Sequence, residues 1–228
     1  MNRARTYVIA AVSLLLGVHA TWAQDMSRYR AYVLASSVES IVASSGVREG
    51  EAKTIHSRPA TIRELEWRAP YASSTAAFAD PVRGISFKFV DDSLFQIVVT
   101  YDRDRTEGLT NADLIETLTA SYGTPTRNVG NASVARPAAA HSDSIVVAQW
   151  ESPLEKLTLV RGSYSPEFQL ILVSKDLSAR AAAVTREAIR LDAAEAPRRE
   201  ANQRKQDAAD ASAAREKTRT SNKAAFRP

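Results

Sequence analysis

The stretch GISFKFVDDSLFQIVVTY, from Gly84 to Tyr101, decides the fold class of this chain. From Ile85 to Phe89 apolar and polar residues alternate, as they do in a β-strand with one buried face. Asp91-Asp92-Ser93 then offers residues typical of a tight turn, and a second apolar run follows from Leu94 to Tyr101. The sequence therefore predicts an antiparallel hairpin within a larger sheet.

Four anchors recur in the same order in the two halves of the chain, which indicates an internal repeat rather than a coincidence of composition. They are Val38-x-x-Ile41-x-Ala43-Ser44-Ser45-Gly46 with Ile115-x-x-Leu118-x-Ala120-Ser121-Tyr122-Gly123, Arg58-Pro59-Ala60 with Arg136-Pro137-Ala138, Trp67 with Trp150, and Phe95 to Val99 with Phe168 to Leu172. We expect two tandem units, residues 24–109 and 110–175.

Each unit is predicted to be one helix followed by three strands. The elements expected in the first unit are a helix over 28–45 and strands over 53–67, 84–90 and 94–101. Those expected in the second are a helix over 111–122, entered by a capping-box variant at Thr110-Asn111-Ala112-Asp113, and strands over 145–151, 155–161 and 167–174. Strands joined by hairpins and accompanied by helices predict an α+β fold, an antiparallel sheet with the helices on one side.

The end of the chain has a different composition. Ala181, Val184, Ala188 and Leu191 recur at helical spacing, so residues 176–196 are expected to dock on the core as a helix. Residues 197–228 form a charged, Ala-rich tail that is expected to be helical or disordered and in either case solvated. Pro197 should break or kink any helix that enters this tail. From residue 192 to the end there are 9 Lys and Arg against 6 Asp and Glu, so the tail could make weak contact with an anionic surface.

The first residues are typical of a secretory signal. Arg3 and Arg5 precede an apolar run over 7–18, and Thr21-Trp22-Ala23 places small residues before a cleavage site, so we expect residues 1–23 to be removed. Val18-His19-Ala20 is the second choice for the cleavage site, and an uncleaved anchor is the alternative, although a spanning helix needs about 20 apolar residues. No later segment is apolar enough to span a membrane, so we expect an exported protein, periplasmic or secreted, with no integral membrane segment after cleavage.

Few residues suggest chemistry. The chain has no cysteine, His56 and His141 lie far apart, and no cofactor fingerprint or metal-ligand cluster occurs, so we predict no cofactor, no metal and no catalytic residue. The near-neutral core also argues against a nucleic-acid partner. Trp67 and Trp150 occupy equivalent repeat positions, which favours a packing role for both.

The candidate binding residues are of two kinds. Tyr71 and Phe78 lie in a connector, Ala69 to Arg83, that only the first unit has, and their rings could anchor an interface. His56 and Arg58 could form a site with the acidic loop 102–107, and co-location of His56 with Asp102 or Asp104 would favour it.

Helices that end at Gly46 and Gly123, together with hairpins at Asp91 to Ser93 and Ser163 to Pro166, give the chain a resemblance at the level of topology. The tandem arrangement resembles the β-lactamase inhibitor proteins, and one unit resembles the small accessory lipoproteins of outer-membrane β-barrel assembly. The resemblance implies a protein-binding role on a concave sheet.

We therefore expect a non-catalytic exported envelope protein, an interaction or structural module with an envelope protein as its partner. The alternative is a hydrolase or small-ligand-binding protein with its site near His56, Arg58 and the 102–107 loop.

Overall fold

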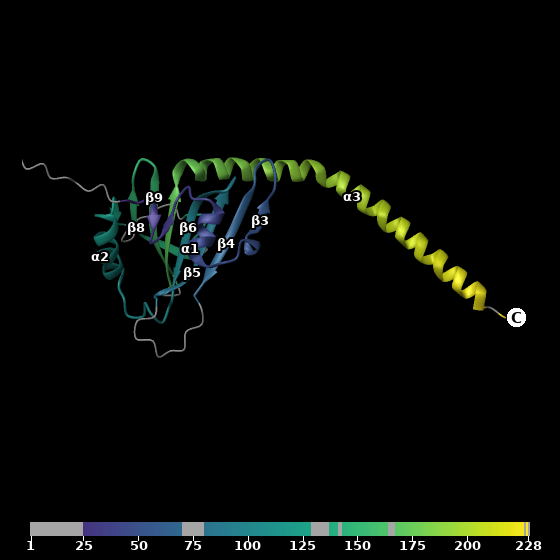
Figure 1. The fold of residues 1–228 in the computed structure, drawn as a ribbon, viewed down its shortest axis with the longest axis horizontal. Coiled ribbons are helices and arrows are strands. Elements are labelled where there is room, and N and C mark those ends of the chain that lie inside the picture. The colour runs from purple at the N-terminus through teal and green to yellow at the C-terminus, as the bar shows by residue number, and fades with distance from the viewer. Residues whose placement is uncertain are drawn as a thin grey trace, which may run out of the picture.

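The computed structural model describes residues 25–69, 80–128, 137–140, 143–163, 167–225 and 227. The expected signal segment, residues 1–23, and the candidate anchors Tyr71 and Phe78 lie outside the described residues, so these three remain predictions. The predicted fold class is confirmed: the described part of the chain is α+β, with antiparallel strands, α-helices and a long C-terminal helix (Figure 1).

A two-stranded sheet pairs β1 (Arg28–Tyr29) with β2 (Tyr32–Val33). The main sheet has eight strands in the order β3-β4-β5-β6-β10-β9-β8-β7, and every neighbouring pair is antiparallel. Its strands are β3 (Lys53–His56), β4 (Ile62–Arg68), β5 (Val82–Val90), β6 (Ser93–Tyr101), β7 (Arg127–Asn128), β8 (Ser144–Glu151), β9 (Glu155–Gly162) and β10 (Phe168–Ser174). The helices are α1 (Val38–Ser45), the short 3-10 helix η1 (Glu49–Glu51), α2 (Asn111–Tyr122) and α3 (Lys175–Ala225). We call α1 with β3–β6 the first half and α2 with β7–β10 the second half.

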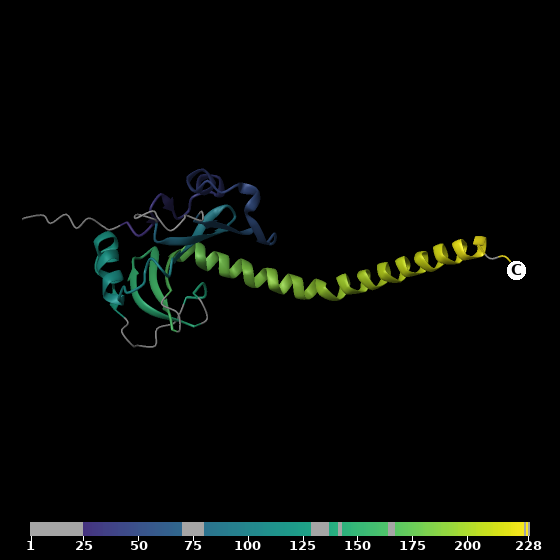
Figure 2. The ribbon, with the colours of Figure 1, turned by 90° about the horizontal axis from the view of Figure 1, so that it is seen from below.

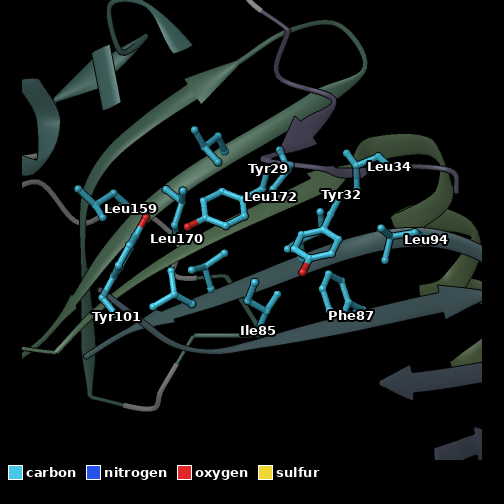
Figure 3. Close-up of a cluster of buried hydrophobic side chains, with 14 of the residues drawn as sticks. Tyr29, Tyr32, Leu34, Ile85, Phe87, Leu94, Tyr101, Leu159, Leu170 and Leu172 are labelled. Atoms are coloured by element: carbon cyan, nitrogen blue, oxygen red, sulfur yellow. The ribbon is translucent and has the colours of Figure 1, made fainter. Parts of the chain in front are cut away.

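The two faces of the main sheet bury different sets of residues. The helical face packs against α1, α2 and the β1–β2 hairpin and forms the main core (Figure 3). Members of this core that the figure labels are Tyr29, Tyr32, Leu34, Ile85, Phe87, Leu94, Tyr101, Leu159, Leu170 and Leu172. The opposite face, which we call the α3 face, buries Ile62, Val90 and Phe95 beneath Ala181 of α3. The prediction of helices on one side is therefore correct for α1 and α2 only, because α3 packs on the other side.

The first helix is shorter than predicted. The apolar residues before Val38 belong to the β1–β2 hairpin, in which Arg30 has a φ of 54°, a left-handed conformation that no α-helix contains. Ser37 is the N-cap, and its side chain accepts a hydrogen bond from the Ser40 backbone N–H. The expected strand over 53–67 is also two strands, β3 and β4, separated by a turn that contains Pro59, which has no N–H for a ladder.

The hairpin at the centre of the first half is as predicted. β5 and β6 are joined by Asp91 and Asp92, whose φ angles of 44° and 69° are those of the two-residue turn that suits the twist of a hairpin. The predicted capping box of α2 is also present, because the Thr110 side chain and the Asp113 side chain each bond the other's backbone.

Helix α3 runs for 51 residues and includes Pro197 (Figures 1 and 2). Both views show it bent near its middle, as expected where a proline removes one backbone hydrogen bond, but Pro197 does not end it. Residues 197–225 are all exposed, so the predicted solvated tail is a projecting helix. No described helix combines the length and the apolar character that crossing a membrane requires.

Candidate functional site

The strand register gives the two tryptophans corresponding places on the helical face. One cross-strand row reads Trp67, Ile85, Val99, Leu170, Leu159, Ala148, and the next reads Leu65, Phe87, Ile97, Leu172, Leu157, Trp150. At the centre of the sheet Val98 of β6 pairs with Ile171 of β10. Trp67 and Trp150 therefore lie at opposite ends of adjacent rows. Trp67 is on β4 and Trp150 is on β8, each two strands outward from the central strands β6 and β10.

In the second half this place is closed. Trp150 is 1% exposed, and its indole N–H donates a hydrogen bond of 2.6 Å to the Gly123 carbonyl at the end of α2. β7 covers the outer edge of β8 by pairing Arg127 with Gln149 and Asn128 with Ala148. The Thr126 hydroxyl adds a bond of 3.0 Å to the Gln149 carbonyl, so the edge next to Trp150 is occupied by the chain itself.

In the first half, no part of the chain that the structure describes closes the corresponding place. Trp67 is only partly buried and lines a groove of about 760 Å³ between the end of α1 and the edge of β4. The lining residues are Ser45, Gly46, Val47, Arg48, Glu51, Lys53, Glu64, Glu66, Trp67 and Arg68. We call this cavity the Trp67 groove.

The difference between the halves begins at the glycines that end α1 and α2. Gly46 has φ 72° and ψ 7°, a left-handed cap, and its N–H bonds the Val42 carbonyl before the chain turns into η1. Gly123 has a similar φ of 78° but a ψ of −172°, so the chain leaves α2 extended and continues along β8. After η1, β3 joins the sheet beside β4 only as far as the Lys53–Glu64 pair. The groove is the length of β4 edge that β3 does not reach.

The groove walls carry charges of both signs. Arg48 pairs with Glu51 at 3.3 Å, and Arg68 pairs with Glu66 at 3.0 Å. All four of these side chains are more than half exposed, so each pair contributes at most about 1 kcal/mol to stability and a ligand can displace it at small cost. The groove therefore combines an aromatic residue with a charged, exposed rim.

The structure does not bring His56 and Arg58 together with the 102–107 loop. Arg58 is bonded by Glu195 of α3 at 2.7 and 2.5 Å, so its guanidinium holds α3 to the β3–β4 turn. His56 pairs with Ile62 of β4, and this cross-strand row meets β6 at its first residue. The 102–107 loop follows the other end of that nine-residue strand. At ~3.3 Å per residue the two groups are separated by about 25 Å along the strand.

The acidic loop has a local role. The Asp102 carboxylate accepts backbone hydrogen bonds from Asp104 at 2.9 Å and Arg105 at 3.2 Å, which stabilises a tight turn. Among the residues that the structure describes, no group of three His, Cys, Asp or Glu side chains could hold a metal ion.

A second cavity, of about 570 Å³, lies between the β1–β2 hairpin and α2. Its aromatic wall includes Tyr29 and Tyr122, and burial raises the pKa of Tyr122 to about 12. The Tyr122 hydroxyl donates to the Arg28 carbonyl at 3.1 Å, and Arg30 beside it makes bonds of 2.5 and 2.8 Å to Asp80. These contacts fix the hairpin on the core and use the polar groups of this cavity structurally.

Sequence reasoning interpreted Trp67 as a packing residue because its counterpart is also tryptophan. The buried Trp150 fits this interpretation, and Trp67 fits it in part, because it packs against the main core and also lines the groove. The residues around the groove, among them Arg48 and Glu66, gave no signal of their own in the sequence.

Comparison with known proteins finds no matching family model, no matching curated protein and no matching solved structure. The function is therefore argued from the groove and from the sheet around it.

Proposed function

We propose that this chain is a non-catalytic exported envelope protein, a protein-interaction module whose binding site is the Trp67 groove. The observation that carries the proposal is the contrast between the two tryptophans. Trp150 is sealed by the chain's own β7 and by Gly123, whereas Trp67 at the corresponding place is only partly buried, beside a strand edge that no described segment covers. Tryptophan is the residue type most enriched at the energetic centres of protein interfaces.

The proposal includes the tandem repeat, for which the register is the main support. A two-fold rotation about the central Val98–Ile171 pair exchanges the two rows of the helical face, so it places Trp67 on Trp150 and Leu65 on Ala148. The repeated sequence anchors also predict that Trp67 is equivalent to Trp150. Pro59 and Pro137 also precede corresponding strands, β4 and β8.

Phe95 is the exception to this correspondence. The β5–β6 register shifts between Lys88 and Phe89, so Phe95 is an extra residue in a bulge and turns to the α3 face, where it packs with Ala181. Phe168 lies on the helical face. A bulge acquired by one copy accounts for this difference without disturbing the central pair.

A duplicated sheet with a partner on one half is also what the resemblance to the β-lactamase inhibitor proteins implies, and this likeness is part of the same proposal. A hydrolase is the alternative. The distance between His56 and the 102–107 loop argues against it, and turnover abolished by His56→Ala in a folded protein would reinstate it.

The projecting part of α3 adds a second contact in this proposal. At 100° per residue, six basic residues fall within about a third of the helix circumference together with one carboxylate, Glu216; the six are Arg198, Arg204, Lys205, Arg215, Arg219 and Lys223. A helix side that is mainly basic suits weak electrostatic contact with an anionic surface of the envelope.

Photo-crosslinking in the cells that make the protein tests the groove. A crosslinking amino acid in place of Arg48 should give an adduct of discrete mass, because position 48 lines the groove. The matched control carries the same amino acid in place of Arg127, beside the closed edge, and should give none. Trp67→Ala should abolish the adduct at position 48. Equal adducts at both positions, or none at position 48, would refute the proposed function.

A further inference from the structure

Along the Trp67 groove, the backbone of β4 has hydrogen-bonding groups that pair with no described strand. Two hydrogen bonds at the ends of β4 fix their direction: the Ala69 N–H donates to the Arg83 carbonyl at 3.0 Å, and the Asp91 N–H donates to the Thr61 carbonyl at 2.9 Å. In an antiparallel pair successive residues point alternately toward and away from the partner strand. The backbone N–H and C=O groups of the odd-numbered residues of β4 therefore point toward β5. Those of Glu66 and Arg68 point the other way, toward the groove.

No described strand takes up these groups. Pairing with β3 stops at Glu64, two residues before Glu66, because the chain there turns away into η1. The open length of edge from Glu66 to Arg68 is bounded by the end of α1 on one side and by Lys53 at its end. This slot matches a short extended segment lying in line with β3.

The second half shows how such a slot is filled. The two-fold rotation that relates Trp67 to Trp150 places Gln149 on Glu66, and Gln149 is paired by Arg127 of β7. The occupant there is an extended, polar segment that follows Gly123, and its Thr126 hydroxyl also binds the Gln149 carbonyl.

We infer that the Trp67 groove takes an extended segment of a partner protein as an added β-strand, antiparallel to β4 and with a basic residue directly opposite Glu66. The inference rests on the proposed function and specifies the partner of that same site. Strand addition gives affinity through main-chain hydrogen bonds, and side-chain pockets give selectivity. Glu66 stands where the second half has the neutral Gln149, so a basic residue in the place of Arg127 gains a cross-strand pair of opposite charges.

Arg68 does not cancel this preference. Its pair with Glu66 is between side chains that are 83% and 57% exposed, so it is weakly held. Glu64, the next carboxylate along this face, is already engaged by Lys88 at 3.8 Å and by the Ser86 hydroxyl at 2.7 Å. Glu66 is therefore the carboxylate that an incoming side chain meets.

A blocked hexapeptide with the sequence of residues 123–128, Gly-Thr-Pro-Thr-Arg-Asn, is the probe. Added to the ¹⁵N-labelled chain, it should shift the amides of Glu66 and Arg68 and the indole of Trp67 saturably. N-methylation of its arginine removes one backbone donor and should weaken binding by about tenfold or more. Replacing that arginine by glutamate should weaken binding roughly two- to fivefold, and Glu66→Lys should restore it.

Before any peptide is added, hydrogen exchange tests whether the slot is empty. The amides of Glu66 and Arg68 should exchange rapidly, whereas those of Leu65 and Trp67, which face β5, should be protected. Protection of all four would mean that the edge is already occupied by the chain, which would overturn the inference.

Proline at position 66 separates the inference from the proposed function. Glu66→Pro removes an N–H that faces the groove and no bond of the β4–β5 ladder, and Glu66→Gln is the matched control that keeps the backbone donor. Loss of the adduct at position 48 in Glu66→Pro but not in Glu66→Gln supports strand addition. An adduct that survives in both, with no discrimination against the N-methylated peptide, overturns strand addition and leaves the proposed function intact. No adduct in the unmodified background refutes both. The N-methylated peptide keeps the test decisive if Glu66→Pro does not fold.

Discussion

The two tryptophans should differ sharply in their contribution to stability. Trp150→Ala removes a fully buried indole and leaves the Gly123 carbonyl without its 2.6 Å donor, so we expect it to lower the free energy of unfolding by about 3–5 kcal/mol. Trp67→Ala removes a side chain that is already partly in contact with water beside an open groove, and we expect a loss of about 1–2 kcal/mol.

Urea unfolding of the two variants, followed by far-UV circular dichroism, measures both values. The slope of the free energy against urea should stay unchanged, since neither variant alters the surface exposed on unfolding by much. Total stabilities of single domains are about 5–15 kcal/mol, so Trp150→Ala should move the midpoint markedly, while Trp67→Ala remains folded enough for binding assays.

Comparable losses in the two variants would refute the reasoning. They would mean that Trp67 is as enclosed as Trp150 and that the groove is not open in solution. Trp150→Phe refines the comparison, because it keeps most of the apolar ring but deletes the donor to Gly123, and it should cost less than Trp150→Ala.

Three further outcomes are expected. Arg30 lowers the pKa of the Asp80 carboxyl through its hydrogen bonds, so the pair stabilises the fold above the unfolded pKa of 3.8. This stability is lost as the pH falls through the folded pKa. In urea titrations Arg30→Ala should therefore be less stable than the parent at pH 7 and converge with it at low pH. The pKa of Tyr122 is raised from 10.0 to about 12 by burial, so its contribution is complete below pH 10 and lost as the pH rises toward 12; Tyr122→Phe should lose less stability over that interval. Deletion of residues 197–228 removes only exposed helix among the described residues and should shift the thermal midpoint by less than about 2 °C, in contrast to a deletion that begins before Ala181.

The sequence predicted the strands well where side-chain alternation is strong. From Ile85 to Tyr101 the pattern defines both strands and the turn, because one face is buried and a shift of one residue would expose every core side chain. It failed for the residues before Val38. Tyr29, Tyr32 and Val38 are apolar at spacings that a helix also allows, and only the backbone reversal at Arg30 distinguishes a hairpin from a helix.

The groove could not have been predicted from local sequence. Gly46 and Gly123 both follow an apolar helical stripe and both have positive φ, yet their ψ angles send the chain in different directions. Whether Trp67 or Trp150 is covered depends on that direction and on where β3 and β7 join the sheet. These are tertiary outcomes, and the repeated anchors by themselves indicated equal burial.

Strand β4 contributes a buried side chain to a core cluster on each face of the sheet. On the helical face Leu65 packs in the core with Val38 and Ile41 of α1. On the α3 face Ile62 lies under α3 in one cluster with Ala181, and the Arg58–Glu195 pair holds the β3–β4 turn to the same helix. These contacts lie in the first part of β4, so they help to hold the strand in position although no described strand pairs with its last residues. A binding segment then loses only its own conformational freedom, which is the condition under which a few main-chain hydrogen bonds and one indole contact give useful affinity. The first part of α3, whose Ala181 lies in one cluster with Ile62 of β4, therefore helps to hold β4 in position for the strand addition that we propose.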